Sequence, residues 1–150
     1  MPVNQYIDHD GINIAADRAV NHFSVHKFGF NPEVQNIEET IWQLGGIYVY
    51  PTSPVAMTVT SASGATDSGV QIKIEGLNEN WDLASEVVTL NASGTATTTT
   101  TFIRINRTFT VGATAAAGQV TVSNGGINYA AQTAADQQTL QCVYSIPRGF

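Results

Sequence analysis

The chain has 150 residues, of which only 12% are charged, and its formal net charge is −6. Its six Lys and Arg residues are scattered, which argues against a nucleic-acid partner, because binding to phosphates needs clustered basic side chains. This length suits one domain with one core. The low charge predicts a neutral, hydrogen-bonding surface that is weakly protected against self-association.

The first 54 residues show weak periodicity and are interrupted by glycine and proline. We expect an extended arm with short strands over residues 1–54, in which the only plausible helix is one or two turns between Pro32 and Leu44. The start of the chain has no basic region and no apolar stretch of signal-peptide length, and no segment approaches 18 apolar residues. We therefore expect synthesis in a cytoplasm and no membrane partner.

The arm is rich in large apolar side chains for a segment with so little periodicity. Such side chains must be buried either on the chain's own domain or on a neighbour. We interpret them as the anchoring residues of an interaction surface. The expected anchors are Phe23, Phe28, Phe30, Trp42, Tyr48 and Tyr50.

From Val55 onward the dominant period is two, which is the period of a strand whose successive side chains point to opposite faces. Residues that favour turns separate the alternating runs. About seven short strands at this spacing predict an all-β domain over residues 55–150, a β-sandwich of the jelly-roll-like kind. The expected strands are Val55–Val59, Val70–Glu75, Ser85–Leu90, a long strand Thr99–Val111, Gln119–Ser123, Ile127–Tyr129 and Thr139–Ile146.

Two local patterns make this expectation more specific. The step Asn124-Gly125-Gly126 is the strongest hairpin signal, because tight turns need residues that tolerate positive φ. The threonine run at residues 97–101 favours extended backbone and predicts an exposed edge, which could pair between copies of the chain.

The residues that usually carry chemistry do not form a convincing site. His9, His22 and His26 all lie in the arm, far in sequence from Cys142, and no Gly-x-Ser-x-Gly elbow occurs. We expect no catalytic residue, no metal, no cofactor and no small-molecule substrate. Cys142 falls in an apolar alternation with Leu140, which predicts a small buried side chain instead of a reactive thiol.

The acidic turn around residues 75–86 leaves a calcium site open, since Ca²⁺ takes oxygen ligands from such loops. Its spacing does not fit an EF-hand, so we favour a turn with solvated charges. Trp81 in this turn could stack on a sugar, but a lid on the core or an interface position is the preferred interpretation.

Two sets of motifs resemble a known family. The arm contains His26-Lys-Phe-Gly-Phe-Asn-Pro32, Glu39-Thr-Ile-Trp42 and Gly45-Gly-Ile-Tyr48, and the later part contains Gly76-Leu-Asn78, Ser85-Glu-Val-Val-Thr-Leu-Asn91, Phe102-Ile-Arg-Ile-Asn-Arg107 and Gln138-Thr-Leu140 followed by Tyr144-Ser-Ile-Pro147. Together these are similar to a set of virion structural proteins of tailed bacteriophages, many from marine hosts. The arginine that usually follows the Lys-Phe-Gly of this set is Phe30 here, which makes the arm more apolar.

The resemblance implies a non-enzymatic component of a phage particle, assembled in the host cytoplasm. The preferred hypothesis is a head decoration, or cement, protein on the capsid surface. Its partners would be the major capsid protein and copies of itself, with a trimer favoured. The alternative is a module of the tail, baseplate or fibre that binds a host-surface polysaccharide through Trp81 and the acidic turn.

Overall fold

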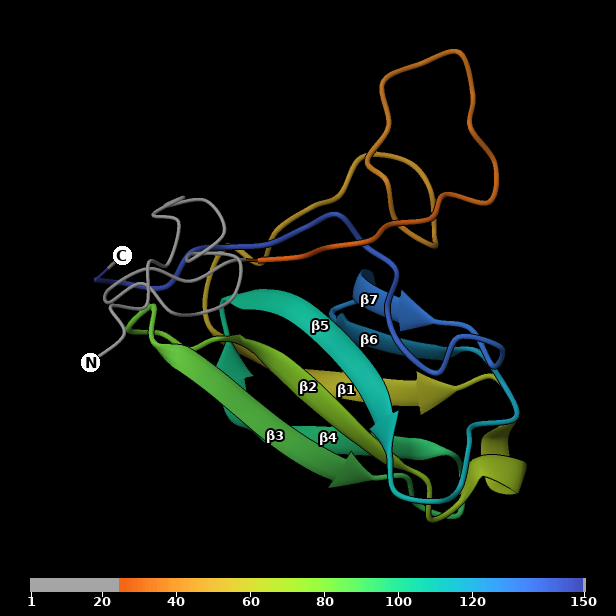
Figure 1. Cartoon of the computed structure of the whole chain (residues 1–150). Helices are drawn as coiled ribbons and strands as arrows, with labels where there is room; N and C mark the ends of the chain where they lie inside the picture. Colours follow the sequence, from red (N-terminus) through yellow and green to blue (C-terminus); the bar gives the residue numbers. More distant parts are fainter. Residues whose placement is uncertain (1–24, 150) are drawn as a thin grey trace, which may run out of the picture.

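The computed structural model describes residues 25–149, and its body is an all-β sandwich of two antiparallel sheets (Figure 1). One sheet has the strand order β4-β1-β6-β7 and the other has the order β3-β2-β5. The predicted β-sandwich of about seven strands is therefore confirmed. The elements are β1 (Val55–Ser61), the short 3-10 helix η1 (Gly64–Asp67), β2 (Gln71–Leu77), β3 (Leu83–Thr89), β4 (Thr95–Phe102), β5 (Arg104–Val111), β6 (Val120–Asn124) and β7 (Ile127–Gln132).

The core lies between the two sheets, and in strands such as β1 and β2 every second side chain points into it. Met57 and Val59 of β1 and Ile72 and Ile74 of β2 have no exposed surface. Fourteen buried residues form one continuous cluster between the sheets. The hairpin between β6 and β7 turns at Gly125 and Gly126, both with positive φ, as the sequence predicts.

The single long strand predicted over Thr99–Val111 is wrong, because the chain crosses from one sheet to the other at Ile103. β4 ends just before this residue in one sheet, and β5 begins just after it in the other. Phe102 and Ile105 are both buried although they are three residues apart, so the inward-facing set changes phase between them. The amide of Ile103 donates to the carbonyl oxygen of Leu77 at 2.9 Å, which holds the crossing against the end of β2.

The threonine run forms an edge strand, as predicted, but this edge is partly closed. The pairing of β4 with β1 contains a bulge, into which Thr98 turns its hydroxyl to accept a hydrogen bond from the amide of Met57 at 2.9 Å. Glu86 of β3 accepts hydrogen bonds from the amides of Thr99 and Thr100 at 3.0 and 2.7 Å. The exposed donors of the bulge are thus satisfied within the chain.

Asp67 at the end of η1 ties three segments together at one end of the sandwich. Its buried carboxylate accepts hydrogen bonds from the hydroxyl of Ser61 and from the amides of Ala117 and Gly118. Burial alone would raise the pKa of Asp67, but these hydrogen bonds outweigh it and lower the pKa below its ordinary value.

The segments outside the sandwich differ from the sequence-based expectation in two ways. Residues 32–44 contain turns and bends but no helix, and residues 139–146 run extended without forming a strand. An isolated bridge between Gln132 and Thr139 is the only sheet pairing that the C-terminal stretch makes with β7. Within residues 25–149 no helix is long and apolar enough to cross a membrane.

Candidate docking surface

A second layer covers one side of the sandwich, and two distant parts of the chain form it: the described part of the arm (residues 25–54) and a C-terminal segment (residues 133–149). The amide of Phe30 donates to the carbonyl oxygen of Leu140 at 3.0 Å, and the amide of Cys142 donates to that of Ile41 at 2.9 Å. Gly29 lies so close to Cys142 that an added Cβ would fall 2.6 Å from Sγ. Any side chain at this position would therefore displace Cys142 and Ile41 where the two segments meet.

A small cluster of buried side chains anchors this layer. Trp42, Tyr48 and Val143 are buried together, and the two rings meet edge to face with centroids 5.1 Å apart. The hydroxyl of Tyr48 donates to the carbonyl oxygen of Tyr129 on β7 at 2.8 Å, and burial raises the pKa of this hydroxyl. Tyr48 therefore fixes the arm to an edge of the sandwich as a neutral donor at every ordinary pH.

The end of the arm nearest β1 is held by a stack of three side chains. The guanidinium of Arg104 lies 4.7 Å from the ring centroids of both Tyr50 and Trp81. It also donates to the carbonyl oxygen of Pro51 at 3.1 Å. Trp81 adopts a positive φ of 63°, which is unusual for a bulky residue, and its ring thereby reaches Arg104. Cation–π contacts with both rings make Arg104 the bridge between the arm and the turn after β2.

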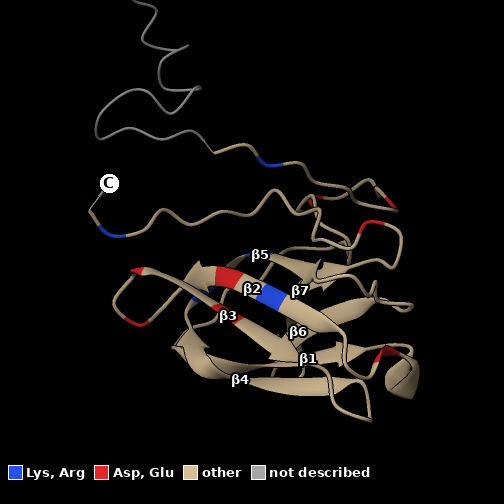
Figure 2. Cartoon of the chain, turned by 60° about the horizontal axis from the view of Figure 1, so that its bottom comes forward, with Lys and Arg blue, Asp and Glu red and all other residues tan. Residues whose placement is uncertain are grey.

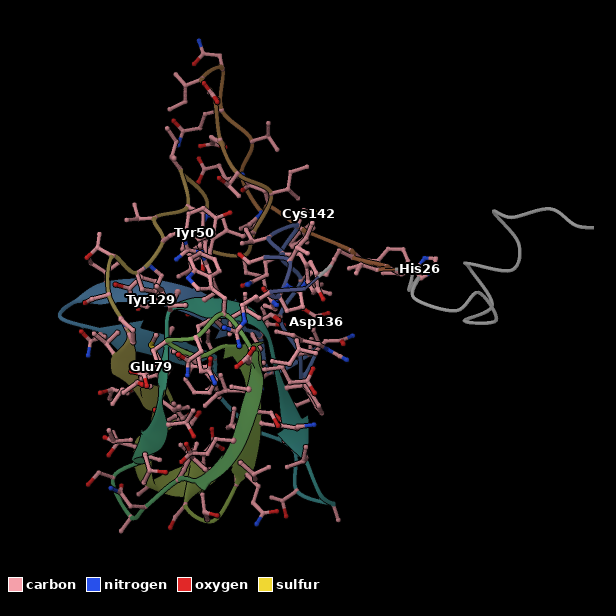
Figure 3. All side chains as sticks on the ribbon, turned by 90° about the vertical axis from the view of Figure 1, so that its left-hand side faces the viewer. His26, Tyr50, Glu79, Tyr129, Asp136 and Cys142 are labelled. Carbon is pink, nitrogen blue, oxygen red and sulfur yellow. The ribbon has the colours of Figure 1, made fainter. Side chains whose placement is uncertain are left out.

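Before Tyr48 the chain forms a projecting loop (residues 30–47), which stands away from the sandwich in Figures 1 and 3. The side chain of Asn31 donates to Glu39 at 2.9 Å, and the amide of Thr40 donates to the carbonyl oxygen of Gly46 at 3.0 Å. These bonds give the loop a defined shape although it contains no helix or strand.

The loop and its flanks carry most of the exposed large apolar side chains of the described chain. Phe28 is 79% exposed and Val34 at the loop is 80% exposed, whereas the apolar residues of the sandwich are mostly buried. Exposed apolar surface concentrated on one projection is typical of a site that contacts another protein. Nine of the fourteen such side chains lie here: Val25, Phe28, Phe30, Val34, Ile37, Ile41, Ile47, Val49 and Tyr50.

A groove of about 500 Å³ lies beside this surface, between the start of the described arm and the outer face of the β3-β2-β5 sheet. Figure 2 shows charged residues on β2 within an otherwise mostly uncharged ribbon. Polar groups from Lys27, Glu75 and Arg107 line the groove together with Tyr144. Lys27 donates to the carbonyl oxygen of Asn106, and burial together with the charge of Arg107 lowers the pKa of Lys27. This groove can offer hydrogen bonds and charge to a polar ligand.

The structure divides the six expected anchors into three groups. Phe28, Phe30 and Tyr50 are exposed and can contact a partner, although Tyr50 also stacks on Arg104. Trp42 and Tyr48 are buried against their own chain, where they support the projecting loop. Phe23 lies outside the described residues.

The expectation that Cys142 is buried is wrong. The period-two pattern of this segment holds, but its inward-facing set is the opposite one: Thr139, Gln141 and Val143 are buried, whereas Cys142 is exposed. Polar side chains can face the sandwich here because β5 offers them partners. Gln141, for example, donates to the carbonyl oxygen of Ile105 at 3.2 Å.

The remaining candidate residues form no chemical cluster. His26 is exposed at the edge of the groove, and His9 and His22 lie outside the described residues. In the part of the chain that the structure describes, no three His, Cys, Asp or Glu side chains are placed to hold a metal ion. Asp82 pairs with Arg148 at 3.2 Å, and Asn78 closes the acidic turn by accepting from the amide of Asp82 at 3.1 Å.

Sequence reasoning missed Arg104 and Lys27. Arg104 sits in the strand region of the sequence between two apolar residues, and only the folded chain brings Tyr50 and Trp81 into contact with it. Lys27 precedes the exposed Phe28 and gives no signal of partial burial. No pattern within either segment could have revealed these contacts, because each joins residues that are distant in sequence.

Comparison of the chain with protein-family models, with curated proteins and with solved structures finds no match in any of the three.

Proposed function

We propose that this chain is a non-enzymatic structural protein that docks on a protein lattice through its projecting loop. The observation that carries the proposal is the concentration of exposed apolar side chains on residues 25–50, next to a sandwich whose own apolar residues are mostly buried. The loop is anchored by Trp42, Tyr48 and Arg104, so its apolar side chains are presented on a shaped support. Preorganisation of this kind lowers the entropic cost of binding.

The resemblance to tailed-phage virion proteins makes the outer head lattice the preferred partner, with the major capsid protein as the docking surface. A single loop contributes a small interface, below the roughly 1,200 Å² of a stable standard one. Attachment at several capsomers by a cluster of copies raises the effective affinity through multivalency. A low surface charge suits such close packing, because neighbouring copies repel one another little.

The test is binding of the purified chain to expanded phage heads that lack it, followed by the resistance of those heads to heat and low salt. We expect a double variant, Phe28→Ser with Phe30→Ser, to lose binding while it keeps its fold. Ile127→Ser is the matched control, because Ile127 is an exposed apolar residue on β7 and is not part of the loop. If wild type neither binds nor stabilises the heads, or the double variant binds as wild type does, the proposal is wrong.

Copy number in purified particles separates placement on the head from placement on the tail. Hundreds of copies per particle support a head protein, whereas a dozen or fewer support a tail or neck component.

The charged side chains of the groove give a specific reason to keep the polysaccharide-binding alternative. Its charged side chains and Tyr144 are of the kind that bind sugar hydroxyls, and Trp81 near the same end of the sheet keeps a partly exposed ring. A glycan-binding screen tests this alternative. A signal that Tyr144→Ala or Trp81→Ala abolishes supports it, and a blank screen leaves lattice docking ahead.

A further inference from the structure

Among residues 25–149, β3 differs from the other edge strands because no other segment hydrogen-bonds to the outer side of its backbone. The edge of β4 is capped by Glu86, and β7 gives the carbonyl oxygen of Tyr129 to Tyr48. The edge of β5 is covered by the C-terminal segment, where the amide of Thr110 donates to Gln137 and that of Thr139 donates to Thr108, both at 2.8 Å.

The backbone of β3 shows which groups are directed to this edge. β3 pairs with β2 over all seven residues without a bulge. Just beyond the two ends of this ladder, the amide of Leu90 donates to Val70 and the amide of Asn78 donates to Asp82. Hydrogen-bonded and non-bonded pairs alternate in an antiparallel ladder, so the even-numbered residues bond to β2. The backbone groups of Leu83, Ser85, Val87 and Thr89 therefore point outward.

The side chains of these same odd-numbered residues also leave the edge unprotected. Leu83 is 66% exposed and Val87 is 48% exposed, and Ser85 and Thr89 are exposed and uncharged. Natural edge strands are usually blocked by lysine, proline, a bulge or an inward charge. β3 has none of the first three, and the charge of Glu86 is turned to the bulge of β4.

We propose that β3 is a self-association edge, along which two copies of this chain pair antiparallel about a twofold axis to make one continuous six-stranded sheet. The register places Ser85 opposite Ser85 of the partner subunit, and Leu83 opposite Val87 of the partner subunit on both sides of the axis. This register pairs the two exposed aliphatic side chains with each other and uses the outward-pointing backbone groups.

Two neighbouring registers with the same symmetry are less favourable. A shift that centres the axis on Glu86 places two carboxylates directly opposite, and like charges in that position are destabilising. A shift that centres it on Val87 leaves Leu83 beyond the end of the partner's strand. The occupant is a second copy because β3 is self-complementary in the first register.

Disulfide trapping tests this register in the full chain, with Cys142→Ser as the background so that no other thiol is present. The two Ser85 Cα atoms would lie about 5.5 Å apart, as in a hydrogen-bonded antiparallel pair, which is within the range that a disulfide bridges. Ser85→Cys should therefore form a covalent dimer at least tenfold faster than Thr89→Cys under the same oxidant. Thr89 is the matched control, because it is exposed on the same edge but would lie about 26 Å from its symmetry mate. Equal rates for the two variants would overturn the proposal.

A second measurement does not depend on an added cysteine. The wild-type chain should dimerise as its concentration rises in sedimentation, and Val87→Lys should weaken the dimer at least tenfold because it places lysines along the edge. Val49→Lys, also at an exposed valine but on the arm, should leave dimerisation unchanged. The amides of Ser85 and Val87 should gain protection from hydrogen exchange only as the dimer forms. Full protection in the monomer would mean that another part of the chain occupies the edge, and this too would overturn the proposal.

This interface lies on a different surface from the projecting loop, so the two proposals fail separately. Val87→Lys tests pairing without altering the loop, and Phe28→Ser with Phe30→Ser tests docking without altering β3. Five paired residues on each side make a small contact, and such a dimer forms readily where copies are concentrated, as on a lattice.

Discussion

The sandwich and the arm layer are both built from extended chain, but different forces hold them. In the sandwich, fourteen buried residues form one cluster and seven strands satisfy one another's backbone groups in regular ladders. In the arm layer only Trp42, Tyr48 and Val143 form an apolar cluster, and scattered hydrogen bonds instead of a regular ladder join the segments to β5 and β7. A region with few buried apolar contacts opens at a lower free energy than the core does. The sandwich is therefore the support, and the arm layer is the part that can adapt to a partner.

The largest expected difference between the sandwich and the arm layer is the loss of stability when a phenylalanine is replaced by alanine. Phe102 has no exposed surface and lies in the core cluster, so Phe102→Ala should lower the free energy of unfolding by about 3–5 kcal/mol. Phe28 is 79% exposed, so Phe28→Ala should change the same quantity by less than about 0.5 kcal/mol. Chemical denaturation measures both. A similar loss for the two variants would contradict the division into support and docking surface.

Period-two alternation predicts the sandwich from sequence because each strand has one face on the core. Predictions from this pattern are wrong in two places where a second segment changes the environment. At Ile103 the chain changes sheets, so one long run becomes β4 and β5. Around Cys142 the inward side faces β5 instead of the core, and Gln141 is buried because β5 offers it a partner. No alternation within one segment can reveal which neighbour that segment will meet.

The candidate site was also predictable only in part, because its residues come from segments that are distant in sequence. Composition marks the arm as too apolar to remain exposed, and this indicates an interaction surface. Contacts with β7 and the C-terminal segment decide which aromatic residues of the arm are buried. Because the sequence does not show these contacts, the buried Tyr48 and the exposed Phe28 look equivalent in it. The lining of the groove comes from residues more than 100 positions apart and has no local signature.

The next largest effect should appear within the sandwich, at its buried carboxylate. Asp67→Asn replaces an acceptor of three hydrogen bonds with a group that has only one acceptor oxygen. The change should lower the free energy of unfolding by about 2 kcal/mol at neutral pH. The folded state lowers the pKa of Asp67, so its contribution is fully present above the unfolded value of 3.8 and is lost as the pH falls through the folded value. The difference in the free energy of unfolding between wild type and Asp67→Asn should therefore become smaller in acid.

Unfolding curves of both proteins between pH 7 and strong acid check this expectation. The difference between the two proteins is the relevant quantity, because Glu86 also has a lowered pKa and makes both lose stability in acid. A gap that stays constant with pH would show that the ionised form of Asp67 is not what stabilises this end of the sandwich.

A smaller effect, confined to the arm layer, is expected from Tyr48→Phe. The change removes the hydrogen bond to Tyr129 and leaves a buried carbonyl oxygen without its partner, at a cost of about 1 kcal/mol. Hydrogen exchange should speed up at the amides of Thr40 and Tyr48, whereas the amides of β1 and β2 should be unchanged. Tyr50→Phe is the control, because the structure shows no hydrogen bond from the Tyr50 hydroxyl to any described residue. Faster exchange throughout the sandwich would mean that the two regions unfold together.

The smallest expected effect tests which set of alternate side chains in the C-terminal segment faces inward, the set with Cys142 or the set with Val143. If Cys142 faced the core, as its alternation with Leu140 suggests, Cys142→Ser would bury a hydroxyl and destabilise the chain. In the structure Cys142 is exposed and Val143 is buried against Trp42 and Tyr48. Cys142→Ser should therefore change the free energy of unfolding by less than about 0.5 kcal/mol, whereas Val143→Ala should cost more than that because it removes buried apolar surface. The native thiol should also react quickly with a water-soluble thiol reagent. A slow reaction of the thiol together with a large loss of stability in Cys142→Ser would mean that Cys142 faces inward. The hydrogen bond from the amide of Cys142 to Ile41 would then have to be wrong as well.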